Sequence, residues 1–286
     1  MSCWIRASAM SRGSRRRRPF RHLTFTLGVA ITALLIATAA LSLVYTPQDP
    51  LAMSITGRLQ GPSDAHLFGT DQYGRDVLSR VMRGAVISIA VGVIAVGIGA
   101  AVGIVIGISS GYVGGWIDEA LMRLVDAIQG FPAILSALLF AAVFAPGIVI
   151  SMVAIGIAFV PAFARLTRAG FLELRAREFV VAARALGARD RRLIARHILP
   201  NTLAPLIVQA TTSFPIAILA EAGLAYLGLG TQPPHPSWGL MLREAQNFLS
   251  MNPWFAVFPG GAIALTVLGL NLLGDGLRDL LDPKTA

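Results

Sequence analysis

The chain is poor in the residues that metal, redox and nucleotide chemistry require. Cys3 is its only cysteine, so it has no disulfide within the chain, no Cys-x-x-Cys pair and no thiolate metal cluster. Its 4 histidines share no metal-ligand spacing. Lys284 is its only lysine, which excludes the Gly-x-x-x-x-Gly-Lys loop that holds nucleotide phosphates. We therefore expect no metal, no cofactor and no enzymatic activity here, and any ATP that drives this protein must be hydrolysed by another chain.

Charged residues are also scarce, at 14% of the chain, whereas 55% of the residues are hydrophobic. The runs Thr24–Val44 and Ala85–Ile108 contain no charge at all, and about 20 such residues suffice to cross the hydrocarbon core of a bilayer. Further apolar segments lie at Phe131–Ala145, Ile148–Phe163, Leu203–Leu229 and Ala256–Gly274. The sequence predicts an all-α membrane protein with six transmembrane helices.

The third and fourth segments are short and are separated only by Pro146–Gly147. They are either two full spans, the first extended backwards through Leu124, or a re-entrant hairpin. Either way the chain enters and leaves on the same side. Before them, an amphipathic interfacial helix is expected, because four apolar residues share one helical face. These residues are Ile117, Leu121, Leu124 and Ile128.

The first apolar run follows Arg17–Phe20, which fits the core of a twin-arginine export signal. Its uncharged length exceeds the apolar region of a signal peptide, however, and further spans follow. We interpret 24–44 as an uncleaved first transmembrane helix that follows a basic N-terminal tail at 1–23.

The arginines determine the orientation. With six spans, 19 of the 24 Lys and Arg residues lie on the side of the N-terminus, and cytoplasmic loops carry such an excess. Both termini are therefore predicted to be cytoplasmic. The net charge of +9 lies beside apolar spans, which indicates contact with anionic lipid rather than nucleic acid. The remaining segments are an outer loop at 45–84, a membrane domain at 85–274, a cytoplasmic loop at 165–202 and a C-terminal tail at 275–286.

Glycines recur at every fourth position of the second span, which places them on one helical face. This spacing predicts a ridge on which another helix packs closely, whereas the alternative is a helix that is merely flexible. The glycines are Gly99, Gly103, Gly107 and Gly111, with Gly115 next in register.

The basic loop contains a predicted helix–turn–helix at Glu178–Asn201. Phe179, Ala183 and Leu186 share one face of the first helix, and Gly187 is suited to end it. Asp190 favours the start of a second helix, and Pro200 is tolerated in a first helical turn. From the residues alone, the segment either docks in a groove of a partner protein or lies on anionic lipid.

The same segment resembles the EAA loop of ABC-importer permeases, which reads Glu-Ala-Ala, three residues, Gly, nine residues and Ile-x-Leu-Pro. In this chain the matching residues are Val181-Ala182-Ala183, Gly187 and His197-Ile198-Leu199-Pro200. Val181 replaces the Glu of the motif and His197 replaces its Ile, and the nearest acid is Glu178. The resemblance implies that this loop couples the permease to an ATPase through Glu178, Phe179, Ala182, Ala183, Leu186, Gly187 and Pro200.

Four further stretches extend the resemblance to the C-type permease subunit of dipeptide and oligopeptide importers, with the nickel importers as relatives. They are His66–Arg80, Gly111–Pro132, Leu227–Leu242 and Asn271–Pro283. The family implies a type I ABC importer permease fold in the cytoplasmic membrane. It also implies a homologous B-type permease, two ATPase subunits that bind ATP and magnesium, and an extracytoplasmic solute-binding protein. The solute is then a peptide or, as the alternative, nickel or another small solute.

Two other polar sites have competing interpretations. Asp71, Arg75 and Asp76 in the outer loop either build a turn and cap a helix or contact the solute-binding protein. Glu221 lies in an apolar span, about 27 Å along a helix from the inner face, where pairing or solvation is expected rather than proton relay. A proton-coupled secondary transporter that works alone would use Glu221 as its switch, and this is the alternative function of a different class.

Overall fold

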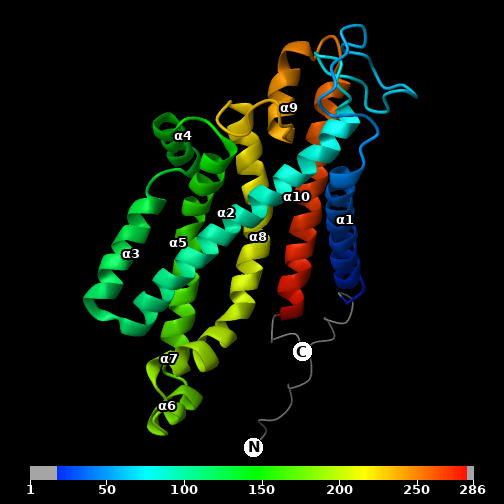
Figure 1. Ribbon diagram of the computed structural model, residues 1–286. Helices are drawn as coiled ribbons and strands as arrows, with labels where there is room; N and C mark the ends of the chain where they lie inside the picture. The colour runs from blue at the N-terminus through cyan, green and yellow to red at the C-terminus, as the bar shows by residue number, and fades with distance from the viewer. Residues whose placement is uncertain (1–17, 282–286) are drawn as a thin grey trace, which may run out of the picture.

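The computed structural model describes residues 18–281, where the regular structure is helical (Figure 1). The predicted tails at 1–23 and 275–286 lie partly outside these residues. Among the described residues, the one β pairing is an isolated bridge between Thr70 and Asp76. The helices are α1 Arg18–Val44, α2 Val77–Val113, α3 Gly115–Gln129, α4 Ala133–Phe144, α5 Ile148–Leu174, α6 Glu178–Ala185, α7 Asp190–Leu193, α8 Leu199–Tyr226, α9 Trp238–Ala245 and α10 Trp254–Leu281.

Five helical segments of the described chain are long and apolar enough to cross a membrane. They coincide with the first, second, fourth, fifth and sixth predicted spans. The segments are Leu23–Val44, Val77–Val113, Ile148–Leu174, Asp190–Tyr226 and Trp254–Leu280.

The third predicted span falls on α3 and α4, which are joined through Gly130–Pro132. In Figure 1, α3 rises beside α5 and α4 lies near the upper end of the bundle, so the two helices together follow its height. With 15 and 12 residues, neither helix is long enough to cross a membrane alone. The count of six spans therefore stays a prediction. The fourth segment belongs to the 27-residue α5, which excludes a short re-entrant limb there.

The apolar face of α3 differs from the predicted one by one residue. Val125 is fully buried, whereas Leu124 is exposed. Spacings of four, four and three residues align Ile117, Leu121, Val125 and Ile128 along one side of the helix.

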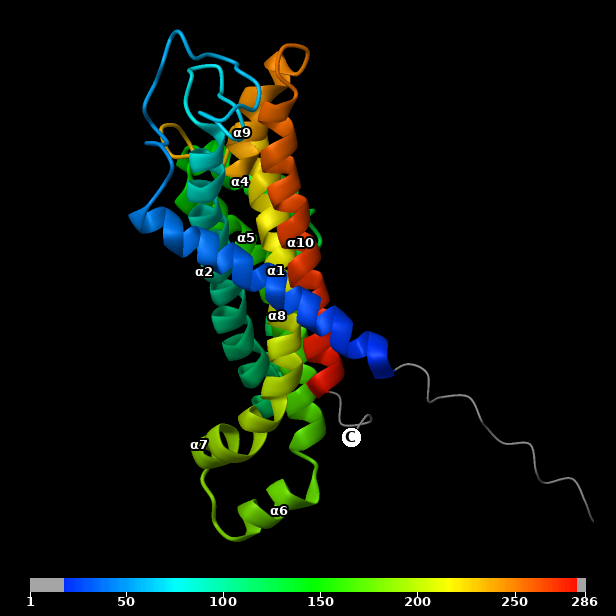
Figure 2. The ribbon, with the colours of Figure 1, turned by 90° about the vertical axis from the view of Figure 1, so that its right-hand side faces the viewer.

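Close packing between helices holds the bundle together. A Cβ at Gly276 would lie 2.6 Å from Phe25 of α1, so glycine permits α1 and α10 to pack side by side. Figure 2 shows α1 crossing obliquely over α8 and α10. Buried apolar side chains of α1, α2, α8, α9 and α10 form one core cluster, and those of α2, α4, α5 and α8 form a second.

The two ends of the bundle differ in structure. The 45–76 loop and α9 lie at one end, and α6 and α7 project from the other (Figures 1 and 2). Arg18 at the start of α1 and Leu281 at the end of α10 lie toward the end that bears α6 and α7. This arrangement agrees with one shared side for the basic loop and both predicted cytoplasmic tails.

Candidate functional site

The predicted helix–turn–helix is present as α6, a turn at Gly187, and α7, which continues through a π-helical turn at Ile194–Ile198 into α8. We call residues 178–200 the elbow. Gly187 has a φ of 84°, a backbone conformation that glycine adopts without steric strain. Asp190 lies in the first turn of α7 rather than at its cap, where its charge complements the helix dipole. Pro200 lies within the first turn of α8, directly after the π-helical turn that connects α7 to α8.

A small core of its own gives the elbow a fixed shape. Val180 of α6 is fully buried against Phe171, Leu193 and Ile198. Ala183 also packs on this core, whereas Phe179 and Leu186 do not. Of the three residues predicted to share a face, one therefore packs on the core and two point away from it. Sequence reasoning missed Val180 as the anchor, because the eight residues of α6 are too few to show which face of the helix is buried.

The outer side of α6 is exposed and apolar. Leu186 is 89% exposed, Val181 55% and Phe179 44%. Ala182 and Glu178 are exposed beside them. Such a cluster on a rigid projection is a typical feature of a surface that another protein covers. We call these five residues the elbow tip.

Tyr112, at the end of α2, links the elbow to the bundle. Its ring packs against the elbow core, and its hydroxyl group is hydrogen-bonded to Asp190 at the start of α7. Nη2 of Arg184 in α6 donates to the same hydroxyl oxygen at 3.4 Å. One side chain of α2 therefore contacts both helices of the elbow. Sequence reasoning missed Tyr112, since 78 residues separate it from Asp190.

A second link joins α3 to α5 at the same end. Nε and Nη2 of Arg168 donate to the two carboxylate oxygens of Asp118, each at 2.6 Å. Asp118 lies outside the five long helices, and the Arg168 guanidinium, together with the Ser110 hydroxyl, lowers the pKa of its carboxyl to about 2. The depressed pKa of Asp118 stabilises the folded protein at pH values above 3.8, the ordinary value of the group, and this stabilisation is lost as the pH falls from there through about 2.

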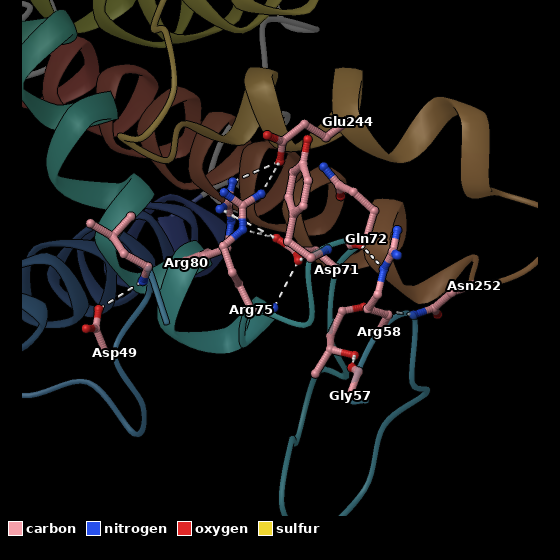
Figure 3. Close-up of polar contacts among 12 residues, drawn as sticks. Asp49, Gly57, Arg58, Asp71, Gln72, Arg75, Arg80, Glu244 and Asn252 are labelled. Carbon is pink, nitrogen blue, oxygen red and sulfur yellow. Dashed lines mark hydrogen bonds and ion pairs between the residues drawn. The ribbon is translucent and has the colours of Figure 1, made fainter. Parts of the chain in front are cut away.

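The opposite end contains a buried network of four charges (Figure 3). Nε of Arg75 donates to Oδ2 of Asp71 at 2.5 Å, and Nη2 of Arg75 reaches Glu244 of α9 at 3.1 Å. Nη2 of Arg80 donates to the same Glu244 oxygen at 2.9 Å, and its Nη1 lies 3.5 Å from Asp71. Two arginines thus balance two carboxylates, as buried charges require.

The three outer-loop residues proposed from the sequence therefore stabilise the fold of the loop itself. Asp71, Arg75 and Asp76 are buried within the chain. Asp76 caps α2 by accepting from the backbone N–H of Ser79 at 2.8 Å, and His66 pairs with its other oxygen at 3.0 Å. Any contact with a binding protein must use the outer surface of the loop rather than these side chains.

The outer loop is also fixed to α10 and to the residues just before it. Nδ2 of Asn252 donates to the carbonyl oxygens of Gln60 and Thr70, at 3.0 and 3.2 Å. The rings of Phe68 and Phe258 stack with their centroids 3.8 Å apart. The 45–76 loop is therefore a folded cap on the bundle, and its side chains have defined positions.

Comparison with known proteins matches residues 103–286 to the family described as the binding-protein-dependent transport system inner membrane component. The chain belongs to this family. It is a permease of the inner membrane. It is 45% identical to the dipeptide transport system permease protein of Alkalihalophilus pseudofirmus over 90% of this chain and 85% of that protein.

A second relative is the glutathione transport system permease protein of Escherichia coli O6:K15:H31. It is 45% identical, over 94% of this chain and 89% of that protein. Among solved structures, an inward-facing MetNI methionine ABC transporter matches with a TM-score of 0.59 at 16% identity. That match covers 71% of this chain and 96% of the other. The permease therefore has the type I ABC importer permease fold.

The predicted glycine ridge lies directly against α5 of the permease. A Cβ added at Gly99, Gly103, Gly107 or Gly111 would lie 2.5–2.8 Å from a side-chain Cβ of α5. These distances are shorter than real Cβ contacts, so only glycine permits this approach of the two helices. Gly115 has no neighbouring atom within 4 Å, and the ridge ends at Gly111.

We predict that Gly103→Ala destabilises the permease by about 1–3 kcal/mol, because the added methyl group overpacks the α2–α5 contact. Its Cβ would lie 2.6 Å from that of Phe163. Gly97→Ala is the matched control on the same helix, since nothing lies within 4 Å of its Cβ. Thermal unfolding of the purified variants measures the difference, and equal stabilities would contradict a packing role.

Glu221 of the permease is buried in α8, five residues before the end of that helix. The Thr231 hydroxyl donates to its Oε1 at 3.0 Å, and Ser237, which caps α9, is a second side-chain partner. Glu221 therefore fastens the α8–α9 loop to α8. The sequence predicted pairing or solvation rather than proton relay, and the structure shows pairing at a buried position.

We predict that Glu221→Gln retains at least about half of wild-type uptake, since the amide oxygen still accepts from Thr231. Glu221→Leu leaves buried hydroxyl groups without a partner and is expected to cost about 1–3 kcal/mol of stability. Complete loss of uptake in a normally assembled Glu221→Gln complex would instead support a proton-coupled mechanism.

Proposed function

We propose that this permease forms half of the translocation pathway of an ATP-driven importer of short peptides. The other half is a homologous B-type permease. Two ATPase subunits bind ATP and magnesium, and an extracytoplasmic solute-binding protein delivers the peptide. The permease itself binds no cofactor and catalyses no reaction.

The observation that carries this proposal is the elbow tip. Apolar side chains that include Leu186 and Val181 stand exposed on a helix whose other side is fixed by a core. A lipid-bound helix would instead bury its apolar side in the membrane and direct its arginines to headgroups. Arg184 points back to Tyr112, and the tip presents few charges. A protein groove is the better match.

Motion at the elbow has a direct route into the bundle. Tyr112 joins the elbow to α2, and the glycine ridge joins α2 to α5. An ATPase that binds two states of the elbow with different affinity would shift the equilibrium between inward-open and outward-open permeases. The coupling residues are then Glu178, Phe179, Ala182, Ala183, Leu186, Gly187 and Pro200.

The names of the relatives support a peptide as the solute. One transports dipeptides and another transports glutathione, which is itself a tripeptide. The test is to purify the complete complex, reconstitute it, and measure ATP-dependent uptake of dipeptides and of nickel. We expect peptide uptake that requires the binding protein. Uptake of nickel alone would overturn the peptide assignment but retain the importer.

A further inference from the structure

A hollow of about 950 Å³ opens at the end of the bundle that bears the outer loop, and of the contacts described above only the Thr231–Glu221 hydrogen bond borders it. The end of α1 with the adjoining start of the outer loop, the second and third turns of α2, the α4–α5 connection and the α8–α9 loop line it. Pockets for small ligands have volumes of about 300–1,000 Å³. This hollow is therefore large enough for a peptide of a few residues.

Arg83 of α2 faces the hollow with most of its donors unused. Its Nη1 donates to the carbonyl oxygen of Ser42 at 3.0 Å, which fixes the side chain against the end of α1. A guanidinium group has five N–H donors. Among the described residues, no carboxylate lies within ion-pair distance of Arg83, unlike Arg75 and Arg80 nearby. The guanidinium group of Arg83 is thus fixed in position and partly buried, and it has N–H donors available for an incoming carboxylate.

Asp49 supplies the opposite charge on the same hollow. Its Oδ1 accepts from the backbone N–H of Leu51 at 2.9 Å, which orients the carboxylate. Figure 3 shows Asp49 apart from the Asp71 network. Within residues 18–281, it forms no salt bridge, either with Arg83 or with another cation. The two charges are therefore both free and separated.

We propose that this hollow binds a short peptide by its two free ends, with the C-terminal carboxylate on Arg83 and the N-terminal ammonium group on Asp49. The inference rests on the proposed function and specifies its solute as a zwitterionic peptide with unblocked termini. The apolar lining, which includes Val86 and Ile148, accepts side chains without selecting among them.

A carboxylate for Arg83 has a second possible source, namely an acidic side chain of the B-type permease. The two sources respond differently to the solute. A peptide carboxylate pairs with Arg83 only when the peptide has a free C-terminus. A partner carboxylate pairs with Arg83 regardless of which solute is present.

The experiment is a double-mutant cycle in the reconstituted complete complex. ATP-dependent uptake of alanyl-alanine and of its C-terminal amide is measured with wild-type and Arg83→Gln permease. Any preference of the binding protein for the acid over the amide is the same in both complexes, so it cancels when the two uptake ratios are compared. We expect Arg83→Gln to lower the acid-to-amide ratio about tenfold, as for other hydrogen bonds to charged groups.

Two variants serve as controls. Arg123→Gln removes an arginine that is exposed on α3 and paired with Glu119, and it is expected to leave the ratio unchanged. Asp49→Asn is expected to lower the preference for alanyl-alanine over its N-acetyl derivative, also about tenfold. If Arg83→Gln fails to assemble, Arg83→Lys keeps the charge, and the Asp49→Asn cycle still tests the site.

An unchanged ratio in both cycles would overturn the site. An equal fall in the uptake of acid and amide would assign Arg83 to a partner carboxylate and also overturn it. If the wild-type complex takes up neither compound while its binding protein retains both, the proposed peptide function fails, and the site fails with it.

Discussion

Gly187→Val is expected to reduce ATP-dependent uptake at least about tenfold while the permease remains in the membrane. Gly187 has a φ of 84° at the turn between α6 and α7. A residue with a Cβ loses about 1–2 kcal/mol in this conformation, and a β-branched residue loses more. The turn relieves this strain by changing direction, which moves the elbow tip away from its partner. Measured on the same vesicles, uptake should therefore fall while ATP hydrolysis continues, so that the two are no longer coupled.

Other changes at the same position isolate the cause. Nothing lies within 4 Å of a Cβ at Gly187, so the effect arises from the backbone and not from a collision. Asparagine tolerates a left-handed backbone, and Gly187→Asn is expected to retain most of the uptake. Ala185→Val adds similar bulk to α6 at an exposed site and serves as a second control. Wild-type uptake by Gly187→Val would refute the role of the turn.

Asp71→Ala is expected to have the largest effect on stability, about 3–5 kcal/mol, because it leaves Arg75 and Arg80 buried without a full set of partners. Asp71 also accepts from the backbone N–H groups of Tyr73 and Arg75, at 2.8 and 3.0 Å. Its loss therefore loosens the turn of the outer loop and leaves Glu244 of α9 as the one carboxylate of the network. Thermal unfolding of the purified complex measures this change.

The matched control is Asp126→Ala. Asp126 pairs with Arg165 at 2.5 Å, but both side chains are exposed. Exposed ion pairs contribute about 0–1 kcal/mol, so a small effect is expected. If the two alanine variants unfold at the same temperature, the Asp71 network does not hold the outer loop.

Local patterns determined what the sequence predicted well. Apolar runs located the long helices, and the four-residue period of Gly99–Gly111 identified the face of α2 that packs on α5. The helix–turn–helix of the elbow was also predicted, because a turn at Gly187 between two short amphipathic segments is encoded within about twenty residues.

Contacts between distant segments were beyond such patterns. Glu244 is separated by 164 residues from Arg80, and no periodicity connects them. The third predicted span is interrupted at Gly130–Pro132, so a hydropathy run does not fix where α3 ends and α4 begins. Arg83 gave no signal either, since its significance depends on the hollow that four separate segments enclose.

The most direct test of the coupling mechanism is site-specific cross-linking at the elbow tip. In a Cys3→Ser background, Leu186→Cys is introduced into the working complex, with Leu139→Cys on α4 as an exposed control at the other end of the bundle. The account predicts that the cysteine at 186 cross-links to an ATPase subunit and that the cysteine at 139 does not. Reaction of the cysteine at 186 with lipid-phase reagents alone, in a complex that still transports, would contradict it.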